Sequence, residues 1–98
     1  MELILESEGG GRLEKADGNF GDIINSLTAS AKTELPWLWG IDPYGVTVFN
    51  VRQVPYVVDN LEKFKENLQS SESRQRVTYY LEFMKRIQQH TYIRLIGD

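Results

Sequence analysis

The sequence predicts a single α+β domain, in which a small and mostly antiparallel sheet of four or five strands packs with about three helices. The chain has 98 residues, which is near the common size of one domain. Strand-like and helix-like stretches are grouped along the chain rather than alternating, which favours α+β over a parallel sheet. No internal repeat or long linker divides the sequence, so we expect one domain over residues 1–98.

The first strand is expected at residues 2–7, where apolar side chains follow one another as in a strand covered on both faces. The glycines at positions 9–11 end this strand. Residues 12–16 can then pair back on the first strand as a short second strand.

A first helix is expected to begin at Asn19, which is a favourable N-cap residue. Asp22 lies in its first turn, where a carboxylate complements the helix dipole. Apolar residues follow at helical spacing and indicate a helix of about ten residues. These residues are Phe20, Ile23, Ile24 and Leu27. We expect the helix to end near Ala31.

Residues 35–50 contain both tryptophans and the clearest turn signal, and we expect them to form a β-hairpin. The tetrapeptide Asp-Pro-Tyr-Gly at 42–45 fits a type I turn, with proline at its second position. Residues 46–49 are β-branched or aromatic, as in a strand. In the strand before the turn, Trp37 and Trp39 would share one face. That face would lie either beneath a helix or against a partner.

Two long helices and a last strand complete the expected fold. Residues 53–69 and 73–89 each carry an apolar stripe at helical spacing, and the break between them is short. They should therefore form an antiparallel pair. Tyr79 falls outside the apolar stripe of the second helix, so we expect it to be exposed. Residues 91–96 read as a terminal strand.

The composition excludes several classes of function. The chain has no cysteine, so it has neither disulfides nor thiolate metal sites. Its net charge of −3 argues against nucleic acid as a ligand, because phosphate binding requires a basic surface. The chain contains no apolar run of about 18 residues and no basic leader, so we expect neither a membrane span nor a signal peptide. These features favour a cytoplasmic protein.

The residues offer little support for catalysis. The sequence contains no phosphate-binding loop, dinucleotide fingerprint or nucleophile elbow. The one histidine, His90, follows a predicted helix, where it fits a capping role. Asp42 is explained by its place as the first residue of the turn. We therefore expect no enzyme activity, no cofactor and no metal site.

Surface recognition has better support, because Trp and Tyr side chains anchor many protein interfaces. Residues 1–50 carry eight acidic and three basic side chains, and this excess could steer a basic partner. We expect Tyr44, in the turn, to be exposed. For the two tryptophans, a place in the core and a place on the surface fit equally well. The expected partner-binding residues are Asp17, Asp22, Glu34, Trp37, Trp39, Asp42, Tyr44 and Tyr79.

Two stretches of the sequence are distinctive. One is the run Gly-Ile-Asp-Pro-Tyr-Gly at 40–45, followed by Thr47, Phe49, Asn50 and Gln53, and the other is the ending His-Thr-Tyr-Ile-Arg-Leu-Ile-Gly-Asp at 90–98. Together they resemble a group of small bacterial proteins, some of which accompany toxins as immunity proteins in polymorphic-toxin or contact-dependent inhibition systems. The resemblance covers roughly residues 35–98, and residues 1–34 carry no matching mark.

The resemblance implies a non-catalytic protein that binds a cognate toxin, often a basic nuclease, and covers its active site or substrate surface. An interface of ordinary size, about 800 Å² on each partner, would suffice. The residues themselves leave two alternatives open. One is a small-molecule-binding or regulatory domain in which Trp37 and Trp39 line a pocket. The other is an accessory subunit of a larger assembly.

Overall fold

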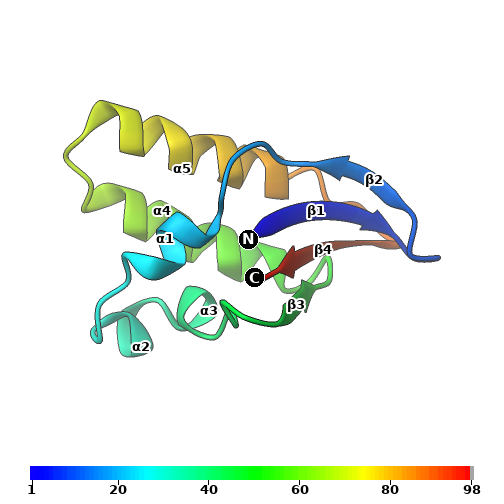
Figure 1. Ribbon diagram of the computed structural model, residues 1–98, viewed down its shortest axis with the longest axis horizontal. Helices are drawn as coiled ribbons and strands as arrows, with labels where there is room; N and C mark the ends of the chain where they lie inside the picture. The colour runs from blue at the N-terminus through cyan, green and yellow to red at the C-terminus, as the bar shows by residue number, and fades with distance from the viewer. Residues whose placement is uncertain (98) are drawn as a thin grey trace.

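The computed structural model describes residues 1–97 and shows, within them, one antiparallel sheet of four strands together with five helices (Figure 1). The expected α+β class is confirmed. The strands are β1 (Glu2–Ser7), β2 (Arg12–Lys15), β3 (Val46–Phe49) and β4 (Thr91–Ile96). The helices are α1 (Gly21–Asn25), α2 (Ala31–Glu34), α3 (Pro36–Trp39), α4 (Val54–Glu66) and α5 (Ser71–Met84).

The first and last strands form the centre of the sheet, which has the order β2-β1-β4-β3. β1 pairs with β4 along its whole length, from Glu2 opposite Ile96 to Ser7 opposite Thr91. β2 and β3 form the two edges, and all neighbouring strands are antiparallel. The strands expected near the two ends of the chain and after the turn are confirmed.

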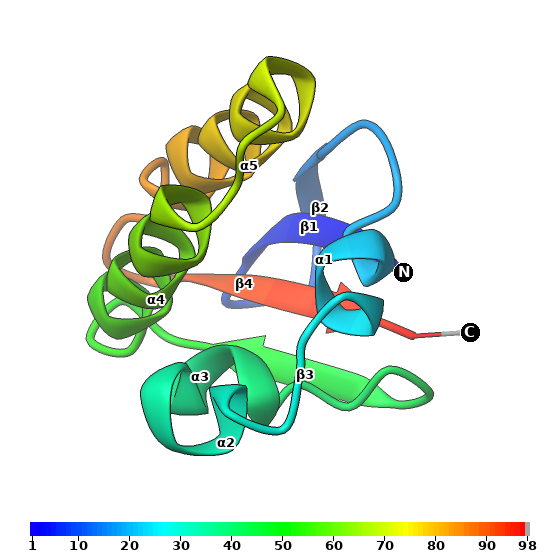
Figure 2. The same cartoon turned by 90° about the vertical axis from the view of Figure 1, so that its left-hand side faces the viewer.

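The two faces of the sheet differ in what covers them. Leu3 pairs with Leu95 and Leu5 with Ile93, so these buried side chains share one face, the inner face. Figure 2 shows α4 and α5 on this side of the sheet. Of the described helices, none covers the opposite face, which we call the outer face. It consists of Glu2, Ile4, Glu6, Arg12, Leu13, Lys15, Val46, Val48, Tyr92, Arg94 and Ile96.

The α4–α5 pair supplies much of the core on the inner face, and both predicted apolar stripes are confirmed. Pro55 lies in the first turn of α4, where its missing N–H costs little. Ser70 caps α5, because its Oγ accepts a hydrogen bond from the Ser73 N–H (3.3 Å). The buried residues of the stripes are Val54, Val57, Val58 and Leu61 in α4, and Val77, Tyr80, Leu81, Phe83 and Met84 in α5.

The first helix begins one residue later than expected and ends early. The N-cap of α1 is Phe20, without a side-chain cap bond, one residue after the predicted Asn19. Asn19 instead ties the chain together before the helix, because its Oδ1 accepts hydrogen bonds from the Gly21 N–H (2.9 Å) and the Met1 amino group (2.7 Å). The expectation of a single helix to about Ala31 is wrong, because α1 ends at Asn25 and a separate short helix, α2, follows. The Ser26 hydroxyl donates to the Ile23 carbonyl (2.7 Å), a local bond that competes with continuation of the helix.

The expected hairpin is wrong on one side of its turn. Residues 36–39 form the short helix α3 rather than a strand, with Pro36 in its first turn. The Asn60 side chain stabilises this start, because its Oδ1 accepts a hydrogen bond from the Trp37 N–H (2.9 Å). Residues two apart on a helix point in different directions. Trp37 and Trp39 therefore do not share a face.

Candidate functional site

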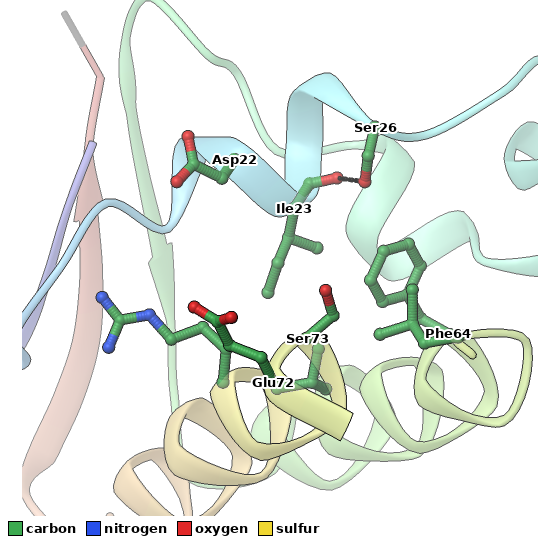
Figure 3. Close-up of a pocket in the computed structure, with 9 residues that line it drawn as sticks. Asp22, Ile23, Ser26, Phe64, Glu72 and Ser73 are labelled. Atoms are coloured by element: carbon green, nitrogen blue, oxygen red, sulfur yellow. Dashed lines mark hydrogen bonds between the residues drawn. The ribbon is translucent and has the colours of Figure 1, made fainter. Parts of the chain in front are cut away.

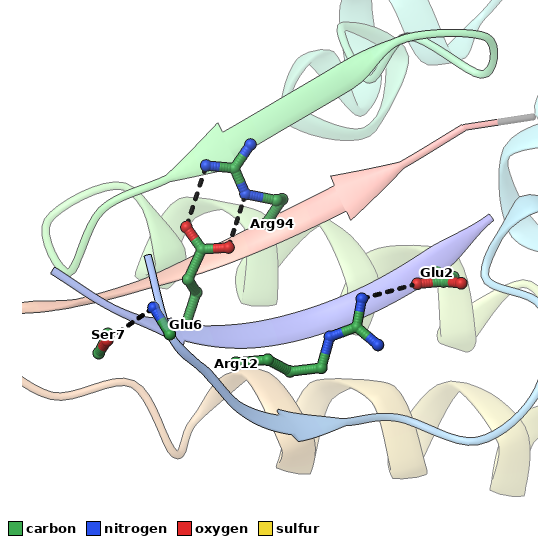
Figure 4. Close-up of polar contacts among 6 residues, drawn as sticks. Glu2, Glu6, Ser7, Arg12 and Arg94 are labelled. Carbon is green, nitrogen blue, oxygen red and sulfur yellow. Dashed lines mark hydrogen bonds and ion pairs between the residues drawn. The ribbon is translucent and has the colours of Figure 1, made fainter. Parts of the chain in front are cut away.

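The outer face combines exposed apolar side chains with paired charges, and Figure 4 shows the pairs Glu6–Arg94 and Glu2–Arg12. Leu13 on β2 and Val46 and Val48 on β3 are all exposed. Between them lies Ile4, which is only 1% exposed. The cross-strand partners of Ile4 are Lys15 and Arg94, and the aliphatic stems of such side chains can cover an apolar neighbour.

Glu6 and Arg94 form a bidentate ion pair at the centre of this face. The Arg94 Nε donates to Glu6 Oε2 (2.8 Å), and its Nη2 donates to Glu6 Oε1 (3.0 Å). The Glu6 side chain is only 13% exposed. Hydrogen bonding to Glu6 raises the pKa of Arg94 above its ordinary value. The guanidinium is therefore held in one orientation by a planar, two-point contact.

A second, more exposed set of charges lies at the β2 side of the outer face. Glu2 is 3.4 Å from Arg12 and 3.7 Å from Lys15. Exposed pairs of this kind contribute little stability. With the central pair included, the outer face carries three basic and two acidic side chains, so the acidic excess of the chain lies elsewhere.

The turn at 42–45 lies at the start of β3. Its predicted structure is supported by the Asp42 carboxylate, whose Oδ1 accepts a hydrogen bond from the Tyr44 N–H (2.9 Å). The Asp42 N–H donates to Thr47 Oγ1 (3.2 Å). Tyr44 is 82% exposed, as expected. The Asp42 side chain therefore shapes the turn, and Tyr44 is the residue that the turn presents to solvent.

The two tryptophans have different environments. Trp37 is half-buried, stacks on Tyr56 with ring centres 5.4 Å apart, and contacts Phe49. Trp39 is 44% exposed. Trp37 is thus mainly a packing residue, whereas Trp39 is available at the surface.

The expectation that Tyr79 is exposed is wrong. Tyr79 is half-buried, and its hydroxyl accepts a hydrogen bond from the Asp17 N–H (2.9 Å). Its ring packs against Tyr80 at a centroid distance of 5.5 Å. The loop before α1 lies on α5 at this point, which the helical periodicity of α5 alone does not indicate.

A cavity of about 370 Å³ lies between α1 and the α4–α5 pair (Figure 3). Asp22 of α1 and Ser26, the residue that follows α1, line one side of the cavity. Glu72 and Ser73 of α5 line the other side. Its apolar lining residues are Ile23, Phe64, Leu68 and Val77, and Arg76 is also in the lining. A neighbouring cavity of about 430 Å³ includes Glu34. Neither tryptophan lines either of these two cavities.

The Tyr80 hydroxyl is an unusual feature close to this region. Tyr80 is 1% exposed, and its hydroxyl is buried without a hydrogen-bond partner. Burial raises the pKa of Tyr80 above its ordinary value of 10.0. The guanidinium of Arg76 lies over both the Tyr80 and Tyr79 rings, at 5.5 and 6.0 Å from their centres.

Comparison of the chain with protein-family models, curated proteins and solved structures finds no match. The resemblance of residues 35–98 to immunity proteins therefore stays a hypothesis. Among residues 1–97, no helix has both the length and the apolar character to cross a membrane. The same residues contain no cluster of three or more His, Asp or Glu side chains arranged to hold a metal ion.

Among the eight expected binding residues, hydrogen bonds join two pairs. Asp42 and Tyr44 share the turn, and Asp17 and Tyr79 share a hydrogen bond. The remaining four are distributed over the short helices, and they are Asp22, Glu34, Trp37 and Trp39. Sequence reasoning missed the outer face, although the alternation of Tyr92, Arg94 and Ile96 was visible. The alternation separates the two faces of a strand but does not indicate which face the helices cover.

Proposed function

We propose that this chain is a non-catalytic protein-binding module, and that the outer face recognises the partner, with the exposed Tyr44 of the turn before β3 as a second contact. The observation that carries the proposal is the composition of the outer face. Exposed Val46 and Val48 lie on the strand beside Arg94, and exposed Leu13 lies two strands away on β2. The Arg94 guanidinium is already oriented by Glu6. Arg and Tyr anchors surrounded by apolar contacts are typical of interface hot spots, and an anchor ordered in advance loses less entropy on binding.

In the form that the resemblance suggests, the partner is a bacterial toxin and the module is a cytoplasmic immunity protein. It would act by occupying the toxin's active site or substrate surface, which requires affinity but no chemical step. The net charge of −3 would favour encounter with a basic toxin. The outer face carries only one basic side chain in excess, so apolar and aromatic contacts would provide most of the affinity.

The first experiment is co-expression with the product of the adjacent gene. We expect the wild-type chain to bind that product and to restore growth. Tyr44→Ala should weaken binding by about tenfold or more, because an exposed aromatic anchor is lost. Lys63→Ala is the matched control, since Lys63 is an exposed residue of α4 away from the sheet face.

The outcomes separate two parts of the proposal. A neighbour that is not toxic, or a chain that neither binds nor protects, would refute toxin neutralisation. Binding that Tyr44→Ala and Val48→Lys leave unchanged would instead refute the assignment of the surface. Both variants should first be shown to have the wild-type circular dichroism spectrum.

A second candidate function is small-molecule binding in the 370 Å³ cavity, which is within the usual size range of ligand pockets. The observation in its favour is the lining of the cavity, which combines apolar side chains with the carboxylates of Asp22 and Glu72 and the guanidinium of Arg76. Since neither tryptophan lines the cavity, melting temperature is a better readout than indole emission. A ligand screen without any shift in melting temperature would argue against this function.

A further inference from the structure

The free edge of β3 carries unpaired peptide groups. In an antiparallel ladder, every second residue directs its N–H and C=O toward the neighbouring strand. The Gly97 N–H donates to the Gly45 carbonyl (2.7 Å), which shows that the odd-numbered residues of this segment face β4. The peptide groups of Val46 and Val48 therefore point away from the sheet. Within residues 1–97, no hydrogen bond to them is found.

The turn before β3 leaves this edge accessible. A side chain at Gly97 would collide with the carbonyl of Pro43, so the turn lies against the inner face at this end of the sheet. The hydrogen bond from the Asp42 N–H to Thr47 Oγ1 agrees, because Thr47 also belongs to the inner face. Figure 2 shows β3 as the outermost strand on its side of the sheet.

The opposite edge is protected in the ways that edge strands usually are. β2 has the sequence Arg-Leu-Glu-Lys, and its register with β1 shifts between Leu5 and Glu6. Charged residues and irregular pairing both discourage the addition of another strand. β3 has the sequence Val-Thr-Val-Phe, with no charge, no proline and no register shift. An edge of this kind is suited to pairing with a further strand.

We propose that β3 pairs with β3 of a second copy of this chain, antiparallel, so that the two sheets become one continuous sheet. One register pairs all the outward N–H and C=O groups of Val46 and Val48. It places Val46 of one copy opposite Val48 of the other. Thr47 then lies opposite its own counterpart. Pairs of β-branched residues and of threonines are favourable across strands, and no charges meet within the paired segment.

The charges beside β3 favour a second copy as the occupant and an antiparallel arrangement. Exposed Asp42 precedes the strand, and exposed Arg52 follows it. An antiparallel pair brings the acidic end of each copy beside the basic end of the other. A parallel pair would bring like charges together. The two-fold axis would be perpendicular to the sheet, so both outer faces would lie on the same side.

The test is the oligomeric state of the purified chain, measured by sedimentation over a range of concentrations. We expect a dimer for the wild type. Val48→Pro removes an N–H that the β3–β4 ladder does not use, so the domain should fold, and the dimer dissociation constant should rise about tenfold or more. Lys15→Pro is the matched control on the other edge, where the Lys15 N–H also points away from the sheet.

A monomer at all concentrations would overturn the proposal, and so would a dimer that Val48→Pro leaves unchanged. If Val48→Pro does not fold, amide hydrogen exchange of the wild type tests whether β3 pairs with β3 of a second copy. Exchange at Val46 and Val48 should slow as concentration rises, while exchange at Thr47 should be slow throughout. Concentration-independent exchange at these two valines would refute self-pairing. The inference does not depend on the proposed function, because toxin binding is not measured.

Discussion

The Asn60 side chain joins α4 to α3, because its Oδ1 lies 2.9 Å from the backbone nitrogen of Trp37. Asn60 is 5% exposed and is the buried polar side chain in the described core. Replacing it with alanine would leave the Trp37 N–H at the start of α3 without this partner. We expect Asn60→Ala to reduce the free energy of unfolding by about 1–3 kcal/mol, measured by urea denaturation.

The matched control for this change is Asn67→Ala, at the exposed end of α4. It should change stability by no more than about 0.5 kcal/mol. Equal effects of the two variants would show that the Asn60 contact is unimportant.

The Glu6–Arg94 pair should contribute more than the other ion pairs. Replacing Arg94 with leucine leaves the Glu6 carboxylate, 13% exposed, without its guanidinium. We expect a loss of about 1–3 kcal/mol, between the values typical of surface and of buried pairs. Replacing both residues with leucine should cost less than Arg94→Leu alone, because no unpaired charge remains. Lys63→Leu, which breaks an exposed pair with Asp59, provides the comparison.

Tyr80→Phe should keep or increase stability, by up to about 1 kcal/mol, because it removes a buried hydroxyl that has no partner. The variant also gives a pH prediction. Burial raises the pKa of Tyr80 in the folded state, so the unfolded chain loses this proton first as pH rises. Wild-type stability should therefore fall above about pH 10 relative to Tyr80→Phe. Parallel denaturation curves for both proteins from pH 8 to 11 would contradict this expectation.

Gly18 is required by its backbone conformation and by its neighbours. Its φ is +85°, and a Cβ there would collide with the Arg76 guanidinium and the Tyr80 hydroxyl. We expect Gly18→Ala to cost about 1–2 kcal/mol in a thermal or chemical unfolding experiment. Gly9→Ala, where nothing lies within 4 Å of the new methyl group, should have little effect. The idea fails if both substitutions are equally tolerated.

Elements with strong local patterns could be predicted from the sequence. The apolar stripes of α4 and α5 and the strand at 91–96 follow from the spacing of apolar residues. These features depend on residues close together in the chain. They are therefore visible without knowledge of the tertiary structure.

Features that depend on distant residues could not be predicted. α3 begins at Pro36 with support from Asn60, and Tyr79 is covered because Asp17 bonds to it. The outer face could not be predicted from the sequence for the same reason. Whether Arg94 faces solvent or the core depends on which side of the sheet receives α4 and α5, and a strand's alternation is the same in both cases.

The central pairing of β1 with β4 also affects how the chain is made. Residues 2–7 are synthesised before their partner, residues 91–96, and every other described element lies between them in the chain. During that interval the central edge of β1 has no strand beside it. Closing contacts between such distant segments is slow. The α4–α5 pair, whose contacts are local, can form before residues 91–96 have been synthesised, and the sheet can assemble on it afterwards.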